Sequence, residues 1–142
     1  MFGKKRKIVS DIDTLIGKNT VIIGDIRFSG GLRVDGHVNG SVTATTGNEQ
    51  HSLLVLSEQG VVEGKIKVPY LVINGVVKGP VHSSENMELQ PGAKITGDIH
   101  YKTIKIHQGA VVEGKMVCHE NTQPEKLITY VASAEEHKEK AE

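Results

Sequence analysis

Apolar and polar residues alternate along most of the chain, and the alternation is organised around a short phrase with glycine at its centre. The phrase has the form apolar-x-Gly-x-apolar, as in Val62-Glu63-Gly64-Lys65-Ile66. Its period of two predicts a β-strand with the apolar residues on one side and the charged residues on the other. The phrase recurs around Gly24, Gly40, Gly64, Gly79, Gly97 and Gly114. These recurrences predict one structural unit repeated along the chain.

The spacing of the phrases predicts how the units are arranged. Successive central glycines lie 16, 24, 15, 18 and 17 residues apart, so the repeat has about 17 residues, with one insertion over Thr43–Ser52. A unit this small cannot bury its apolar face alone and must stack on its neighbours. A second turn signal such as Asn74-Gly75 precedes the later phrases, and an alternating pair such as Leu71 and Ile73 precedes that signal. Three short strands and three corners per repeat predict a triangular turn of a parallel β-helix.

We expect an all-β, right-handed parallel β-helix of about six triangular turns. The six central glycines have the inward parity, where they leave no side chain and allow the wall to bend at a corner. The alternative is the left-handed hexapeptide helix, which also has about 18 residues per turn but needs an aliphatic residue at every sixth position. The gaps between units vary in length and do not keep that spacing, which favours the right-handed form.

Composition narrows the class of protein. The chain has 142 residues, of which 37% are hydrophobic, and this is enough for one domain with its own core. The formal net charge is zero, so bulk charge gives no indication of nucleic-acid binding. The single Cys118 excludes an internal disulfide framework and is typical of a reducing cytoplasm. No apolar segment has the length of a transmembrane helix or the form of a signal peptide.

The N-terminal segment has a different character from the repeats. One aromatic residue is followed closely by four consecutive cations, which is typical of a contact with the anionic inner leaflet of a membrane. Each cation near such a surface contributes about 1 kcal/mol, so one copy binds weakly and many copies on a polymer bind tightly. The predicted membrane-binding residues are Met1, Phe2, Lys4, Lys5, Arg6 and Lys7.

Three regions are predicted along the chain. Residues 1–18 form a basic membrane-targeting segment and linker, residues 19–117 form the β-helix, and residues 118–142 form a polar, largely disordered tail. Within the tail, Leu127–Ala134 is expected to form a helical turn or two. The first and last regions are therefore expected to be flexible.

The two ends of the predicted helix are candidate sites of self-association. A β-helix exposes a strand edge at each end, and such an edge templates the addition of another strand unless it is capped. No cap helix is evident at either end of the repeats. The candidate residues at the N-terminal end are Val21, Ile23, Ile26 and Phe28, and those at the C-terminal end are Ile104, Ile106, Val112 and Met116.

Candidate catalytic and metal sites are weak. His82 and His100 each follow a repeat glycine by three residues and should stack on adjacent turns, but no third histidine or carboxylate shares their column. Gly30-Gly31 is not followed by the remainder of a phosphate-binding loop. We therefore predict no catalytic residue, metal, cofactor or small-molecule substrate. The alternative is a left-handed β-helix enzyme, either a trimeric acyltransferase or a zinc-dependent carbonic anhydrase.

A family resemblance is carried by Leu15-Ile16-Gly17, Gly24-Asp25-Ile26 and the run Phe28–Gly36, and it covers about residues 13–117. In these residues the repeats resemble those of the bactofilins, bacterial polymer-forming cytoskeletal proteins. The resemblance implies a right-handed β-helix that forms non-polar filaments without nucleotide, and an N-terminal peptide that targets the inner face of the cytoplasmic membrane. It also implies a non-enzymatic scaffold for a cell-wall enzyme or polarity protein, with effects on cell shape.

Overall fold

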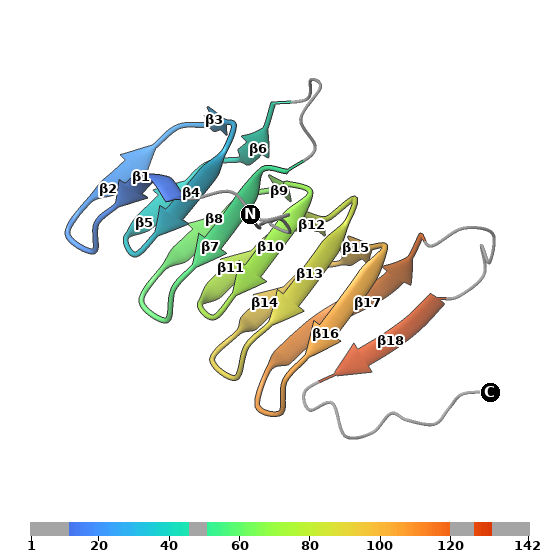
Figure 1. Cartoon of the computed structure of the whole chain (residues 1–142). Coiled ribbons are helices and arrows are strands. Elements are labelled where there is room, and N and C mark those ends of the chain that lie inside the picture. Colours follow the sequence, from blue (N-terminus) through green and yellow to red (C-terminus); the bar gives the residue numbers. More distant parts are fainter. Residues whose placement is uncertain (1–11, 46–50, 120–126, 132–142) are drawn as a thin grey trace, which may run out of the picture.

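The computed structural model of the chain describes residues 12–45, 51–119 and 127–131. Within these ranges all regular structure is β-strand, and the strands wind into a coil whose turns lie side by side along one axis (Figure 1). Parallel pairing links each turn to the next, and one face contains six strands. The predicted all-β parallel β-helix of about six turns is therefore confirmed.

Each turn contributes one strand to each of three faces. The first face contains β1 (Ile12–Ile16), β4 (Gly31–Val34), β7 (Leu53–Leu56), β10 (Tyr70–Ile73), β13 (Asn86–Leu89) and β16 (Thr103–Ile106). The second face contains β2 (Val21–Ile23), β5 (His37–Asn39), β8 (Val61–Glu63), β11 (Val76–Lys78), β14 (Lys94–Thr96) and the first part of β17 (Val111–Cys118). The third face contains β3 (Ile26–Phe28), β6 (Val42–Ala44), β9 (Ile66–Lys67), β12 (Val81–His82), β15 (Ile99–Tyr101) and the last part of β17.

The core is a set of apolar columns that run along the axis of the helix. Because the register is parallel and constant, each inward side chain lies next to its equivalent in the neighbouring turns. On the first face, Leu54, Leu71 and Met87 form such a column, and all three are fully buried. Two further columns, on the second and third faces, are Ile22–Val38–Val62–Val77–Ile95–Val112 and Ile26–Val42–Ile66–Val81–Ile99–Met116.

The central glycines form the corner between the second and third faces. Gly79 has φ of +146°, a backbone conformation that residues other than glycine rarely adopt. Its amide donates a hydrogen bond to the Thr96 carbonyl in the next turn (2.9 Å), so the ladder continues through the corner. A Cβ atom at Gly79 would contact the backbone of Gly64 in the preceding turn. Close backbone stacking, as well as conformation, therefore requires glycine at this corner.

The structure sets the limits of the helix more finely than the sequence does. β1 pairs with β4, and Ile16 is buried next to Val34. The first turn therefore includes residues from Ile12 onward, which were expected to belong to the linker of residues 1–18. Thr43 belongs to β6, where it pairs with Arg27. The insertion is therefore shorter than the predicted Thr43–Ser52, and residues 46–50 lie outside the described residues.

Candidate functional site: the two ends of the helix

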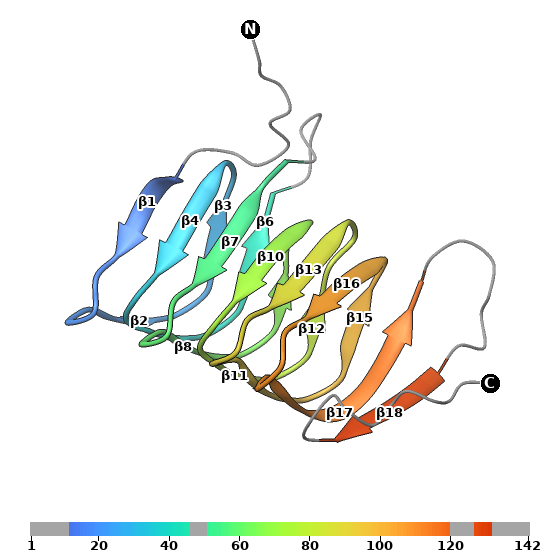
Figure 2. The same ribbon diagram turned by 60° about the horizontal axis from the view of Figure 1, so that its bottom comes forward.

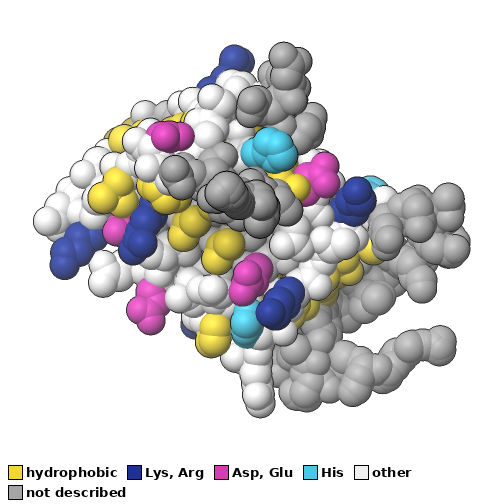
Figure 3. Space-filling model, viewed as in Figure 1, with side chains coloured by type: hydrophobic (Ala, Val, Ile, Leu, Met, Phe, Trp, Pro, Cys, Tyr) yellow, Lys and Arg dark blue, Asp and Glu magenta, His cyan; other side chains and the backbone are white. Residues whose placement is uncertain are grey.

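The N-terminal end presents three strands that each have one neighbour among the described residues. β1, β2 and β3 are the terminal strands of their sheets and pair only with β4, β5 and β6. Of the predicted assembly residues, Val21 and Ile23 point outward and are exposed, whereas Ile26 and Phe28 point inward and are half-buried against the core. The first turn therefore combines strand edges that are unpaired among the described residues with apolar side chains at the surface (Figure 3).

Ile23 is the most unusual of these side chains. It is 83% exposed, although it lies in an outward column whose other members are polar. Those members are Asn39, Glu63, Lys78, Thr96 and Glu113. A large aliphatic residue exposed in an otherwise polar column indicates a contact surface.

The C-terminal end differs between its faces. On the first face, β16 has no further partner in the described part of the chain, and Ile104 and Ile106 are half-buried. On the other two faces, Val112 and Met116 are only 2% and 4% exposed. The structure thus places two of the four predicted C-terminal assembly residues at an open edge and two in the core.

An additional strand, β18 (Leu127–Val131), lies beside β17 where the second and third faces end, and among the described residues no such strand lies beside β16. β18 pairs antiparallel with β17, from Val117 opposite Leu127 to Glu113 opposite Val131. The expectation of an uncapped C-terminal end is therefore wrong for the second and third faces. The expected helical turn within Leu127–Ala134 is also wrong for these five residues, since a free strand edge lies beside them. Their run of β-branched and aromatic residues is a strand signal that could have been recognised from the sequence.

The predicted stacking of His82 on His100 is confirmed. Their ring centroids lie 4.4 Å apart with an interplanar angle of 6°. His119 adds a third ring, 5.2 Å from that of His100, and His100 Nδ1 lies 3.0 Å from His119 Nε2. The sequence-based prediction included only the two rings of the register column and missed this third one. In the backbone register Val117 lies opposite His100, and the imidazole of His119 reaches the stack from two residues further on.

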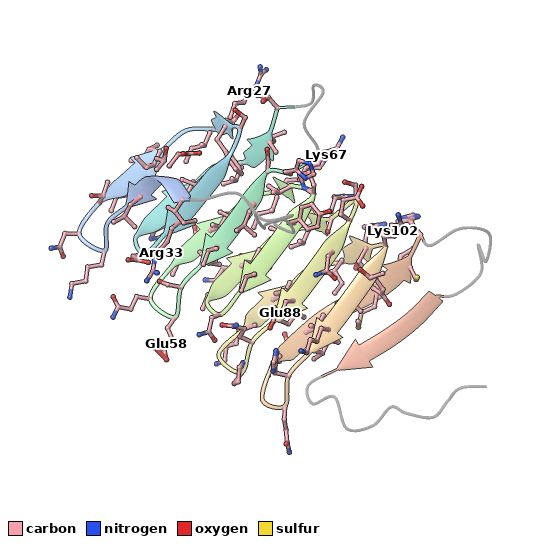
Figure 4. All side chains as sticks on the ribbon, in the orientation of Figure 1. Arg27, Arg33, Glu58, Lys67, Glu88 and Lys102 are labelled. Carbon is pink, nitrogen blue, oxygen red and sulfur yellow. The ribbon has the colours of Figure 1, made fainter. Side chains whose placement is uncertain are left out.

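The surroundings of the stack favour neutral imidazoles. A groove of about 480 Å³ is lined in part by Lys67, Lys102 and the three histidines, and both lysines project from the same edge of the helix (Figure 4). Burial lowers the pKa of His82 below the ordinary value of 6.5, and the charges of His100 and of nearby lysines lower it further. Burial also lowers the pKa of His100, as does His119, while Asp98 acts in the opposite direction.

Other charged groups on the outer surface form pairs along the columns. Lys78 Nζ lies 3.9 Å from Glu63 Oε2, across neighbouring strands of the second face. His107 donates from Nε2 to Glu88 Oε2 at 2.7 Å. The Cys118 thiol is half-buried and lies 3.7 Å from the Lys102 carbonyl oxygen. These are pairwise contacts between neighbouring turns. No group of three or more potential metal ligands lies together in the described part of the chain.

Acidification should destabilise the helix through the histidine stack. Because folding lowers the pKa values of His82 and His100, the unfolded chain binds protons more readily below about pH 6.5. The stabilising effect of the neutral rings is therefore complete above about pH 6.5 and is lost as the pH falls through the lower folded-state values. We expect a lower melting temperature at about pH 5 than at about pH 7.5.

Circular dichroism melts of the chain and of His100→Gln measure this effect. The difference between the two pH values should shrink in the variant, because one ring of the stack and its charge are gone. An unchanged difference would assign the pH dependence to groups outside the stack.

The remaining predicted site lies outside the described residues. Met1, Phe2 and the cations at positions 4–7 belong to the first eleven residues, which the structure does not describe. Among the residues that it does describe, none form a helix long and apolar enough to cross a membrane.

Comparison with known proteins agrees with the architecture. The family model described as "Bactofilin: Polymer-forming cytoskeletal" matches residues 14–117, which are most of the chain. Bactofilin BacO of Myxococcus xanthus (strain DK1622) is 31% identical over 112 residues, covering 79% of this chain and 84% of BacO. Bactofilin BacP of the same organism is 28% identical over 115 residues, covering 80% of this chain.

The match to BacP spans only 45% of that protein, so the chain corresponds to less than half of its length. No solved structure matches significantly. The family match covers all six corner glycines, begins within β1, ends within β17 and stops before β18. The chain belongs to the bactofilins, a family of polymer-forming cytoskeletal proteins.

Proposed function

We propose that this chain assembles end to end into non-polar filaments in which like ends meet. The observation that supports this most directly is the N-terminal turn, whose strand edges have no further partner in the described part of the chain and whose Ile23 is exposed. An unpaired edge beside apolar side chains is a template for another edge. A second copy related by a twofold axis supplies an edge of identical composition, so the contact is self-complementary. Repetition of such contacts at both ends gives a filament without polarity.

The proposed assembly requires no nucleotide. Pairing of strand edges and burial of apolar side chains both occur on contact and need no hydrolysis step. Gly30-Gly31, the glycine pair with the composition of a phosphate loop, leads into strand β4 and not into a helix. A phosphate-binding loop needs the N-terminus of a helix after it.

We further propose that the filaments lie on the inner face of the cytoplasmic membrane, held by the segment Met1–Lys7. Its four cations each contribute about 1 kcal/mol near anionic lipid, and Phe2 adds about 1.5–3 kcal/mol if it is buried in the interface. A single copy would therefore bind reversibly. A filament presents one such segment per subunit, and the combined attachment is tight through avidity.

A filament on the membrane would act as a non-enzymatic scaffold for cell-wall enzymes or polarity proteins. Each outer face repeats with the spacing of stacked turns, about 4.8 Å between neighbouring strands. Ion pairs between turns, such as Glu63 with Lys78, leave side chains of both partners partly accessible. A partner that recognises one subunit would therefore meet the same surface many times along the filament.

The test compares the full chain with a variant lacking residues 1–7, by negative-stain electron microscopy and by sedimentation with liposomes containing anionic lipid. Both proteins should form thin filaments at physiological salt without nucleotide, and only the full chain should sediment with the liposomes. Discrete particles of fixed size from the full chain at every concentration would contradict the filament. Equal sedimentation of both proteins with liposomes would contradict the role of the N-terminal segment.

A further inference from the structure

β18 is the one antiparallel strand in a fold whose other described pairings are all parallel. Its five residues lie along Glu113–Val117 and cross the corner at Gly114, so β18 pairs with the last residue of the second face and with the third face up to Val117. In Figure 2 it lies beside β17 at the end of the helix, beyond the last complete turn. The family match ends at residue 117, so this strand is additional to the repeats that define the family.

The core residues of the last turn, beside β18, are more deeply buried than their equivalents in the first turn. Ile22 and Ile26 begin two inward columns at the N-terminal end, where no strand of the described residues covers them, and both are only partly buried. Met116, which pairs with Ile128 of β18, ends the column of Ile26 and is 4% exposed. Val112 ends the column of Ile22, one residue before the segment that β18 pairs with, and is 2% exposed. The columns are equivalent in register, so the difference between their two ends coincides with the presence of β18.

β18 runs along β17 in the direction that the β17 strand of a second copy would take in a tail-to-tail contact. When two β-helices meet tail to tail about a twofold axis perpendicular to the helix axis, their edge strands must run antiparallel. A head-to-tail contact would place them parallel. β18 pairs antiparallel with β17 and therefore occupies the backbone edge in the orientation that a twofold-related β17 would adopt. The two occupants cannot bind the same edge at once.

The short connection between β17 and β18 favours pairing within one chain over pairing with a second copy. Eight residues, 119–126, separate β17 from β18. A strand held by such a short linker meets its site at an effective concentration on the order of millimolar. A separate copy at micromolar concentration would compete at a disadvantage.

We propose that β18 occupies the surface through which C-terminal ends pair, and that it must leave β17 before two copies can join there. This inference rests on the proposed end-to-end assembly. It assigns to the tail control over the concentration at which filaments form. It also makes the edge of β17 an acceptor for one antiparallel strand, supplied either by the same chain or by a second copy.

The test measures the critical concentration for assembly by sedimentation in three proteins besides the full chain. The first is the double variant Ile128→Pro/Thr129→Pro. Adjacent amides in a strand point in opposite directions, so one of the two lost donors must face β17. The second ends at His119 and lacks the tail. The third, Ala134→Pro/Glu135→Pro, has the same number of prolines beyond the end of β18 and serves as the matched control.

We expect the critical concentration of the first two variants to fall at least tenfold below that of the control and the full chain. Hydrogen exchange of the unassembled proteins should show faster exchange over Glu113–Val117 in the proline variant and unchanged exchange over the preceding turns. Equal critical concentrations in all four proteins would overturn the inference and leave end-to-end assembly intact. So would a loss of assembly in the first two variants, since the strand would then form part of the filament contact. Absence of polymer in all four proteins would instead overturn the assembly itself.

Discussion

Gly79→Ala should largely unfold the β-helix, with an expected loss of about 4 kcal/mol or more in the free energy of unfolding. The new Cβ atom would contact the carbonyl oxygen of Gly64 and lie 2.8 Å from its carbonyl carbon. Neither group can move away easily, because Gly64 donates to the Lys78 carbonyl (2.9 Å) and Gly79 donates to the Thr96 carbonyl (2.9 Å). A loss of this size approaches the whole stability of a small domain.

Gly24→Ala is the matched control. Gly24 has φ of +135°, close to the +146° of Gly79, but no atom of another described residue is found within 4 Å of the position that its Cβ would occupy. Conformational strain alone costs about 1–3 kcal/mol, so this variant should stay folded. Urea unfolding followed by circular dichroism compares the two proteins. If they are destabilised equally, backbone stacking between turns is not the reason for glycine at this corner.

The repeat explains why so much of the fold could be predicted. Each of the six corner glycines conveys the same information about a bend, and each alternating pair conveys the same information about an inward column. A prediction supported by several equivalent units is insensitive to irregularity in any one of them. His82 and His100 were placed on adjacent turns in this way, because both follow a corner glycine by three residues.

Features outside the repeat could not be predicted by the same argument. The pairing of β18 depends on which edge is free at the end of the helix, and no local pattern in Leu127–Val131 records that edge. His119 joins the histidine stack from outside the register column, where Val117 is the equivalent residue. Counting residues from a corner glycine therefore identifies register partners on adjacent turns. It does not identify side chains, such as that of His119, that join a column from beyond the last turn.

The same distinction applies to the assembly residues. The sequence indicates apolar residues at both ends, but parity and burial separate those that can form a contact from those that hold the core. Met116 is 4% exposed, so the substitution Met116→Arg would place a charge in the core and would test folding and assembly together. Ile23 points outward from the first turn and makes little contact with the core, which makes it the better position for a test of assembly.

Ile23→Arg should abolish filaments while leaving the β-helix folded. In a twofold contact between N-terminal ends, the edge strands of the two copies lie side by side, so the substitution introduces two like charges into one interface. It also removes two large apolar side chains from the surface that is buried. A combined cost of about 3 kcal/mol raises the critical concentration by more than a hundredfold. Electron microscopy and analytical ultracentrifugation measure the result.

Asn39→Arg is the control, because Asn39 is exposed in the same outward column one turn further along. It adds the same charge to the same face and should leave filaments intact. Filaments from Ile23→Arg would exclude the N-terminal turn as a contact, and loss of filaments in both variants would place the contact along the side of the helix. The size of the Ile23→Arg particles carries further information. Dimers would show that C-terminal ends can pair with β18 displaced, and monomers would show that β18 holds its place on β17 when only that end is available.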